Sequence, residues 1–376
     1  MADARVTQLA RILVDHSTKV RPGERVVIFG RLPAVPLMLE TYRVCLERGA
    51  HPYTFVRNPY GQPGLPDQEF MYYKHASDAQ LEEADPFIRL AIESADAFIR
   101  IDSDENTRHL SSVDPGLISR RRLANAHTSA IFRQRSKEKS LRWVYTLFPT
   151  AGLAQDAEMS LSEFEDFVYR TAFADQTDPV HAWAEVYARQ QTLVEYLAGK
   201  SQVRVEGENI DLSLSIAGRK FINCAGEYNI PDGEIFTGPV EESVEGWVRF
   251  TYPAVNAGRE VDDVELHFKS GRVEDASASK NQAYLLSQID LDPGARFLGE
   301  FAIGTNSMVD RFTRNILFDE KIWGTIHMAL GAGYAESGSR NDSLLHWDMV
   351  YDMRSGGKIF VDDELFYDSG DFVFSP

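Results

Sequence analysis

A strand, a helix and a second strand follow one another early in the chain, and this order limits the folds open to it. The apolar run ERVVIFG at 24–30 predicts a buried strand, and VPLMLETYRVCLERGAH at 35–51 predicts a helix that ends at Gly49. PYTFVRN at 52–58 predicts the next strand. Two strands joined in this way by a helix pair in parallel through a right-handed crossover, so we expect a parallel sheet.

The alternation of helices and strands continues to about residue 150. Helices are predicted at 85–95 and 117–139, and strands at 96–103 and 142–150. The turn after the first strand, GRLPAVP, has none of the GxGxxG spacing that a dinucleotide pyrophosphate requires. We therefore expect a Rossmann-like α/β domain without a nucleotide signature.

Helical patterns extend this region to about residue 200. AQDAEMSLSEFEDFVYRTAF at 154–173 predicts one helix, with Ser160 or Ser162 as a possible N-cap. DPVHAWAEVYARQQTLVEYLAGK at 178–200 predicts another helix, which ends at Gly199. The α/β character therefore gives way close to residue 200.

From residue 201 onward, short strands replace the helices. SQVRVEGENIDLSLSIAGRKFINC at 201–224 alternates apolar and polar residues between turn residues, and similar segments continue to about residue 305. The same pattern returns from residue 344 to the end of the chain. We predict two domains: an α/β domain at 1–195, and a β-rich, mostly antiparallel α+β domain at 196–376.

The charge balance and the cysteine count narrow the classes of function. A net charge of -18 would repel nucleic acid and anionic membranes, so neither is an expected partner. The chain has 2 cysteines, too few for a disulfide framework or a thiolate zinc site. The first residues, MADARVTQLARILVDHSTKV, lack the unbroken apolar core of a secretory signal, and we expect a cytoplasmic protein.

Residues 324–353 contain several groups that bind metals or move protons: His327, Tyr334, Glu336, His346 and Asp348. From His346 onward apolar and polar side chains alternate, as they do on a strand, so His346 and Asp348 point the same way. An imidazole and a carboxylate on one face can reach a single divalent cation. Such pairs also occur as hydrogen-bonded structural pairs, so accompanying residues must decide between the two interpretations.

Two further stretches supply carboxylates. The turn Pro231-Asp232-Gly233 delivers Glu234 at the start of a predicted strand, and RFLGEFAIGTN at 296–306 places Glu300 between apolar neighbours. A charged side chain at a half-buried position is costly unless it is paired or bound to a metal. Glu300 is therefore a candidate for a metal or catalytic role.

Several ordered blocks of this chain resemble the M29 family of metallo-aminopeptidases, the aminopeptidase T and aminopeptidase S group. The blocks are NIPDGEIFTGPVEESVEG, FLGEFAIGTN, DEKIWGTIHMALGAGY and SLLHWDMVYDMR. The resemblance implies an α/β domain followed by a β-rich domain with two divalent metal ions, zinc, cobalt or manganese, and a homodimer acting on peptides. It assigns the metal ligands to Glu234, Glu300, His327, His346 and Asp348, and places Tyr334 beside them.

The expected chemistry gives these residue types distinct tasks. Two metals would lower the pKa of a water and polarise the scissile carbonyl, with Glu300 as our candidate for the bridging ligand. Tyr334 would donate a hydrogen bond to the oxyanion, and Glu336 would act as general base and acid. Glu336 also fits a solvated residue of a Gly- and Ser-rich loop. The family often has proline after the tyrosine, where this chain has Ala335.

Two other functions compete with this interpretation. Ring-cleaving dioxygenases that act on dihydroxypyridines resemble the same family, and their single ferrous ion would need only His327, His346 and Asp348. Retention of Glu234 and Glu300 argues against a mononuclear site. A non-enzymatic scaffold is the other alternative, but none of the expected ligands is missing.

Overall fold

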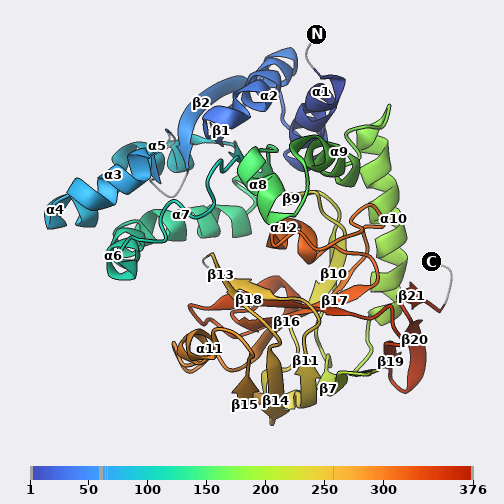
Figure 1. The fold of residues 1–376 in the computed structure, drawn as a ribbon. Helices are drawn as coiled ribbons and strands as arrows, with labels where there is room; N and C mark the ends of the chain where they lie inside the picture. Colours follow the sequence, from blue (N-terminus) through green and yellow to red (C-terminus); the bar gives the residue numbers. More distant parts are fainter. Residues whose placement is uncertain (1–2, 59–61, 64, 66, 257, 374–376) are drawn as a thin grey trace. The chain divides into compact units, whose positions relative to one another are not determined.

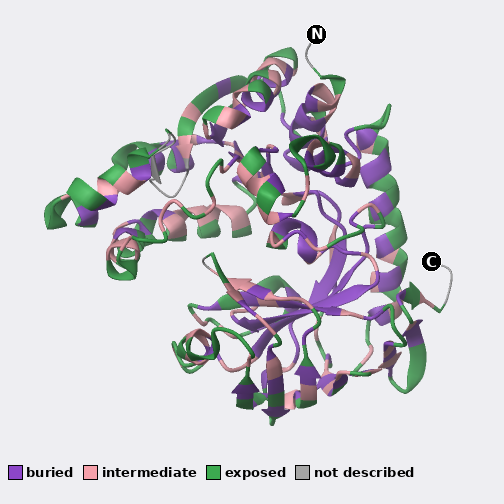
Figure 2. Ribbon diagram, in the orientation of Figure 1, coloured by how far each residue is buried: buried purple, intermediate pink, exposed green. Residues whose placement is uncertain are grey.

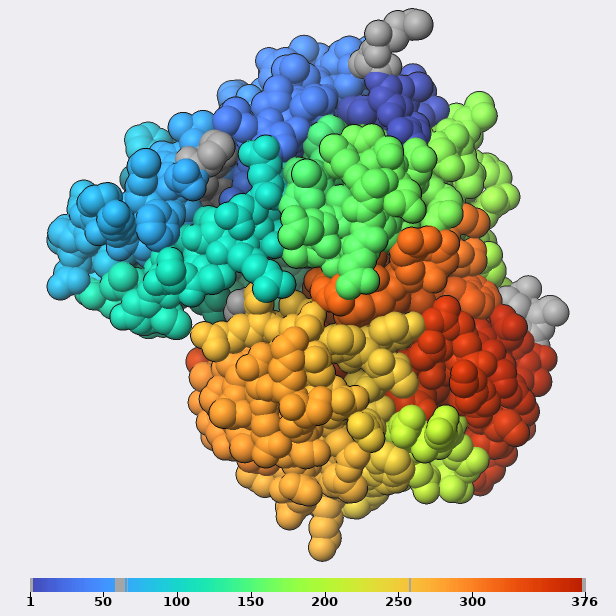
Figure 3. All heavy atoms as spheres, viewed as in Figure 1, coloured from blue at the N-terminus to red at the C-terminus, as the bar shows by residue number. Residues whose placement is uncertain are grey.

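The computed structural model describes residues 3–58, 62–63, 65, 67–256 and 258–373 (Figure 1). The chain divides into two compact units. Unit 1 contains Met1–Trp183 and Gly226–Pro231, and unit 2 contains Ala184–Ala225 and Asp232–Pro376. The yellow, orange and red atoms of Figure 3 belong largely to unit 2 and form a continuous surface there.

Unit 1 is built on a parallel sheet, as the early strand-helix-strand pattern predicted. The strand order is β3-β2-β1-β4-β5-β9, and every pairing is parallel except the one between β2 and β3. The strands are β1 (Arg25–Gly30), β2 (His51–Asn58), β3 (Gln62–Pro63), β4 (Ala97–Asp102), β5 (Arg142–Leu147) and β9 (Asn229–Ile230).

Helices connect these strands, and the longest predicted ones are shorter or divided in the structure. The helices are α1 (Ala4–Arg11), α2 (Val35–Glu47), α3 (Gln68–His75), α4 (Asp78–Glu82), α5 (Pro86–Ser94), α6 (Pro115–Ala124), α7 (Ala126–Lys137), α8 (Ala151–Asp156), α9 (Leu161–Thr171) and α10 (Pro179–Leu197), which continues into unit 2. Short π and 3-10 turns lie at Ile12–Ser17 and Leu32–Ala34. No helix in the described ranges has the length and apolarity needed to cross a membrane.

The single helix predicted at 154–173 is wrong, because a break separates α8 from α9. Glu158 adopts a φ of +57°, which a helix does not tolerate. Ser160 then caps α9 by accepting a hydrogen bond from the backbone N–H of Glu163, and the Glu163 side chain bonds back to Ser160. The reciprocal capping starts a new helix where periodicity alone predicted a continuous one.

Unit 2 contains two larger sheets and a two-stranded ribbon. A five-stranded sheet has the order β18-β17-β16-β10-β8, and an eight-stranded sheet has the order β15-β14-β11-β7-β6-β19-β20-β21. The elements are β6 (Gln202–Gly207), β7 (Ile210–Ser215), β8 (Ile222–Cys224), β10 (Glu234–Thr237), β11 (Glu245–Arg249), β12 (Ala254–Asn256), β13 (Arg259–Val261), β14 (Glu265–Lys269), β15 (Arg272–Ser277), α11 (Gln282–Ile289), β16 (Leu298–Gly304), α12 (Ile316–Asp319), β17 (Thr325–Gly331), β18 (His346–Asp352), β19 (Lys358–Val361), β20 (Glu364–Asp368) and β21 (Asp371–Phe372), with 3-10 turns at Glu241–Ser243 and Ala335–Ser337.

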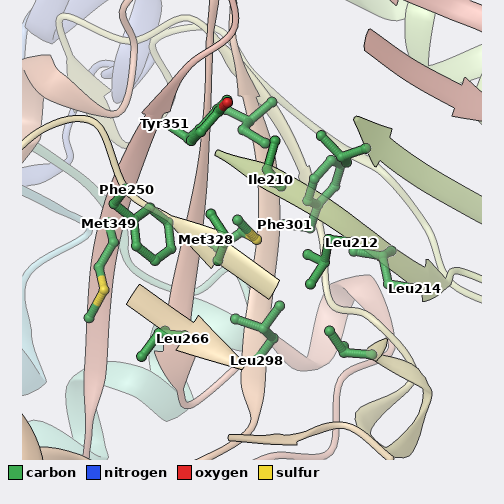
Figure 4. Packing of buried hydrophobic residues seen from close by; sticks show 14 of the residues in the cluster. Ile210, Leu212, Leu214, Phe250, Leu266, Leu298, Phe301, Met328, Met349 and Tyr351 are labelled. Atoms are coloured by element: carbon green, nitrogen blue, oxygen red, sulfur yellow. The ribbon is translucent and has the colours of Figure 1, made fainter. Parts of the chain in front are cut away.

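The core of unit 2 joins apolar side chains from both sheets. Leu212 and Leu266 of the eight-stranded sheet belong to the same buried cluster as Phe301, Met328 and Met349 of the five-stranded sheet (Figure 4). The eight-stranded sheet alternates buried and more exposed residues along its strands, whereas every residue of β16 and β17 is buried (Figure 2). The central strands of the five-stranded sheet are therefore covered on both faces.

A β-bulge at Gly299 decides which way Glu300 points. The register between β16 and β17 shifts between Leu298 and Glu300, so that both Leu298 and Phe301 join the core although they are three residues apart. A Cβ on Gly299 would lie 2.2 Å from the carbonyl oxygen of Ala332, which leaves room only for glycine. The bulge thus turns Glu300 to the face opposite the core.

Candidate metal centre

The five predicted ligands lie on one face of the five-stranded sheet. Strand alternation places Ile235, Phe301, Met328, Trp347 and Met349 in the core. Their sequence neighbours therefore face the other side, and these neighbours are Glu234, Glu300, His327, His346 and Asp348. One face of the sheet supplies the apolar core, and the other supplies ionisable groups.

Small residues leave room between these ionisable groups. Ala329 stands between Glu300 and Asp348 in the pairing of β16, β17 and β18, and Ala302 stands beside His327. Glu234 pairs with Gly304 across β10 and β16. Because alanine and glycine fill little of this face, the longer carboxylate and imidazole side chains can converge above them.

The side chains form two groups that share Glu300. In each group, of Glu234, Glu300 and His327 or of Glu300, His346 and Asp348, the nearest ligand atoms lie within 4.8 Å of one another. Oε1 of Glu300 is 3.5 Å from Nε2 of His327, and Oε2 is 3.7 Å from Nε2 of His346. The two oxygens of a single carboxylate therefore lie toward different histidines.

The hydrogen bonds and surroundings of the two imidazole rings are compatible with metal binding. Nδ1 of His346 donates a hydrogen bond to the carbonyl oxygen of Ala332 at 2.8 Å, which leaves Nε2 as the ligand atom of the neutral ring. His327 is fully buried, and its Nε2 lies 3.1 Å from Oε2 of Glu234 and 3.5 Å from Oε1 of Glu300. This buried nitrogen therefore faces two carboxylates, and a cation held between them would take Nε2 as a ligand.

The charges of the cluster shift its pKa values strongly. Burial opposes the charge of Glu234, but the Lys321 ammonium and the His327 ring lower its pKa to about 2. Burial together with the negative charges of Asp348 and Glu234 raises the pKa of Glu300. Burial disfavours the charged form of His346, but Asp348 and Glu300 outweigh it and raise the pKa to about 9. Without metal, protons occupy the positions that cations would take.

Two residues that sequence reasoning missed, Lys321 and Glu320, lie beside this cluster. Lys321 is fully buried, and its Nζ lies 2.6 Å from Oε1 of Glu234 and 2.7 Å from Oε1 of Glu320. Glu320 also lies within ligand distance of His327 and Asp348, and burial raises its pKa to about 8. A Glu-Lys pair before a strand is typical of a solvated turn, so nothing in the local pattern predicted its burial.

Tyr334 and Glu336 follow β17 but occupy different surroundings. The Tyr334 ring packs against the rings of Phe236 and His346, with centroid distances of 5.2 and 5.4 Å. Oγ of Ser337 donates to the carbonyl oxygen of Tyr334 and accepts from the backbone N–H of Gly238, which ties this loop to the end of β10. Glu336 is exposed, and we find no ion pair or hydrogen bond to its carboxylate within the described ranges. The structure therefore brings Tyr334, but not Glu336, into contact with the cluster.

Comparison with known proteins gives a family match over almost the whole chain. Residues 2–372 match the family model described as thermophilic metalloprotease (M29). The sequence is 29% identical to aminopeptidase 2 of Geobacillus stearothermophilus, over 91% of this chain and 90% of that protein. It is 27% identical to aminopeptidase T of Thermus thermophilus, over 66% of this chain and 68% of that protein.

Solved structures share the fold. Wild-type AmpT from Thermus thermophilus superposes with a TM-score of 0.85 at 21% identity, covering 98% of this chain and 99% of that one. The 2,5-dihydroxypyridine dioxygenase of Pseudomonas putida KT2440 is more distant, with a TM-score of 0.55 at 13% identity over 99% of this chain and 98% of that one. At such identities the structural likeness concerns the fold alone.

Proposed function

The chain belongs to the M29 family of thermophilic metalloproteases, and we propose that this metal-dependent aminopeptidase works with two divalent cations. Glu234, Glu300, His327, His346 and Asp348 would hold them. The observation that carries the proposal is the place of Glu300, whose carboxylate belongs to both groups of candidate ligands. A mononuclear site of two histidines and one aspartate would leave two buried glutamates without a task.

The residues around the cations divide the work of hydrolysis. Bound divalent cations would supply a water of lowered pKa and polarise the scissile carbonyl. Desolvation of the phenol and the negative charges of Glu300 and Asp348 raise the pKa of Tyr334 well above its usual range, so the phenol stays protonated at neutral pH and would donate a hydrogen bond to the developing oxyanion. Glu336 is our candidate for the general base that later protonates the leaving amine, a role that requires its exposed loop to turn toward the cluster when substrate binds.

We assign Lys321 a positioning role. Its ammonium holds Oε1 of Glu234 at 2.6 Å, while Oε2 of the same carboxylate lies 3.1 Å from Nε2 of His327. One oxygen of Glu234 is therefore engaged by Lys321 and the other faces the imidazole. Lys321 would orient Glu234 and offset part of the negative charge that the cluster carries when metals are absent.

We propose zinc, cobalt or manganese as the cations, peptides as substrates, a homodimer as the working form and the cytoplasm as its place. Light scattering coupled to size-exclusion chromatography measures the mass in solution, and a mass of one chain at working concentration would refute the homodimer.

Metal content and substrate choice test the proposed function together. We expect two metal ions per chain by elemental analysis, and hydrolysis of aminoacyl-p-nitroanilides that stops with chelator and returns with cobalt or zinc. N-acetylated substrates should remain uncleaved, because an aminopeptidase needs a free α-amino group. One iron per chain with oxygen-dependent ring cleavage of dihydroxypyridines would replace the proposal with the dioxygenase alternative.

A further inference from the structure

Tyr334 belongs to the loop between β17 and β18, and burial does not fix its side chain. The residue is 47% exposed, whereas Ser337, three positions further along the chain, is fully buried. The Tyr334 ring contacts the rings of Phe236 and His346, but nearly half of its surface stays open. An exposed tyrosine can meet a substrate, so its position depends largely on the backbone that carries it.

Ser337 connects the loop of Tyr334 to two other segments of unit 2. Its backbone N–H and its Oγ both donate to the carbonyl oxygen of Tyr334, at 3.1 and 2.7 Å. The same Oγ accepts a hydrogen bond from the backbone N–H of Gly238 at 3.1 Å. The carbonyl oxygen of Ser337 accepts another from the backbone N–H of Lys220 at 3.0 Å. One buried serine thus joins this loop to the end of β10 and to the segment before β8.

The strand that receives this anchor also carries a candidate metal ligand. β10 begins at Glu234, and it ends directly before Gly238. Between them Phe236 packs against the Tyr334 ring at a centroid distance of 5.2 Å. The strand therefore holds the ring of Tyr334 directly and its backbone through Ser337. Groups that are fixed to one strand keep their separation more closely than groups on independent loops.

A glycine lets the same loop pack directly on the bulge of β16. A Cβ on Gly333 would lie 2.1 Å from Oγ of Ser339 and 2.5 Å from the carbonyl oxygen of Gly299. Only glycine fits at this position, directly before Tyr334. The loop is therefore held against the backbone that directs Glu300.

The tip of the loop, Ala335 and Glu336, lies between the two hydrogen-bonded residues and is exposed. This tip can turn toward the cluster while Tyr334 and Ser337 stay in place, because neither of its side chains takes part in the anchor. The hydrogen bonds of Ser337 consequently restrict the phenol and not the carboxylate that we propose as general base.

We propose that Ser337 is a positioning residue, which holds Tyr334 where its phenol donates to the developing oxyanion. This role rests on the proposed function, in which Tyr334 stabilises that oxyanion. A donor that is already in place costs no reorganisation when the oxyanion forms, so a looser loop slows the chemical step. Ser337 therefore supports kcat rather than the binding of substrate or metal.

A double-mutant cycle on the metal-loaded, full-length protein tests the role. Ser337→Ala should lower kcat for aminoacyl-p-nitroanilides about tenfold to a hundredfold, with KM within about threefold and metal content unchanged. Tyr334→Phe should lower kcat about a hundredfold or more, because it removes an oxyanion donor. Adding Ser337→Ala to Tyr334→Phe should then lower kcat by less than about twofold, since no hydroxyl is left to position.

Ser287→Ala is the matched control. Oγ of Ser287 also donates to the carbonyl oxygen of a tyrosine three residues earlier, Tyr284, at 2.7 Å, but it does so on the exposed surface of α11. Loss of this hydrogen bond should leave kcat, KM and metal content as they are in the wild type.

The outcomes separate positioning from a merely structural role and from the proposed function. An unchanged kcat in Ser337→Ala, or a kcat that falls by the same factor with and without the Tyr334 hydroxyl, would overturn the positioning role alone. Loss of metal from Ser337→Ala would overturn it as well, since the serine would then serve the metal centre. An unchanged kcat in Tyr334→Phe would overturn the oxyanion role and the positioning role together.

Should Ser337→Ala fail to fold, as circular dichroism would reveal, Ser337→Cys takes its place. The thiol keeps a side chain of similar shape and makes weaker hydrogen bonds. We expect kcat to fall about threefold to tenfold, and the fall should again vanish in the Tyr334→Phe protein. An equal fall in both proteins would count against the positioning role.

Discussion

The two faces of the five-stranded sheet in unit 2 are built from the same strands, yet one carries apolar side chains and the other carries ionisable ones. One face contributes Phe301, Met328 and Trp347 to the core. On the other face Glu300 is 4% exposed and His327 is fully buried, so these polar groups are as hidden as the core residues. Burial alone therefore does not separate residues that stabilise the fold from residues that serve its chemistry.

The difference lies in what burial does to each face. Burying a Phe or Met side chain stabilises the folded chain by about 1.5–3 kcal/mol, whereas burying carboxylates beside one another destabilises it. Burial and neighbouring carboxylates raise the pKa of Glu300, whereas Lys321 and His327 lower the pKa of Glu234. The core face contributes the stability that lets the other face hold charges in an unfavourable place, where the proposed cations would offset them.

Adjacent substitutions on the two faces give the largest expected contrast. Glu300→Ala should lower kcat/KM by about a thousandfold or more, because it removes the proposed ligand shared by both groups, while the metal-free protein should unfold no more easily. Phe301→Ala should cost about 3–5 kcal/mol of unfolding free energy with a much smaller loss of activity per folded molecule. Urea titration of the metal-free proteins and peptidase assays measure both. Equal loss of stability in the two variants would refute the division between the faces.

The second-largest effect is expected from a change at the β-bulge, which directs Glu300 away from the core. Gly299→Ala places a Cβ 2.2 Å from the Ala332 carbonyl oxygen, so the strand must shift and Glu300 with it. We expect activity to fall about a hundredfold and stability by about 1–3 kcal/mol. Gly116→Ala is the control, since its nearest atom is a side-chain oxygen at 3.2 Å. Activity within twofold of wild type would show that the bulge does not set the direction of Glu300.

Removal of the buried ammonium tests whether the polar face needs its own counter-charge. Lys321→Met should weaken metal binding or activity about tenfold to a hundredfold and destabilise the metal-free protein, since Glu234 and Glu320 lose their cation. Calorimetric titration with zinc measures the affinity. Lys200→Met, at a partly exposed lysine paired with Glu364, should change neither quantity. Metal affinity unchanged in Lys321→Met would remove its positioning role.

The mildest perturbation, which replaces no residue, is a change of pH, and metal loading should depend on it. The pKa of His346 is raised to about 9 and that of His327 is also raised, so in the metal-free protein both rings bind protons more tightly than in the unfolded chain. Stability from these groups is therefore present below about pH 6.5 and is lost as the pH rises through about 9. Zinc affinity should change in the opposite direction, rising up to about tenfold per pH unit for each proton displaced. Titrations in buffers of different ionisation enthalpy measure that release, and an affinity independent of pH between 7 and 9 would contradict it.

Local patterns predicted much of what the structure contains. The early strand-helix-strand order predicted parallel pairing of β1 and β2, and that prediction is confirmed. Alternation from His346 onward predicted that His346 and Asp348 share one face of a strand, as they do in β18. These features depend on neighbours a few residues apart, which is the range over which strand and helix periodicity operates.

The sequence by itself determined the types of residue available to the candidate centre and the strands that present them. Only the tertiary structure decided that Lys321 lies buried against Glu234, that Glu320 joins the group and that Glu336 remains exposed. It also placed Glu69 beside Arg31 at the edge of the other sheet. These contacts depend on strand register, on a bulge and on loop packing between distant segments. All three follow from how the whole chain buries its apolar surface rather than from any local pattern.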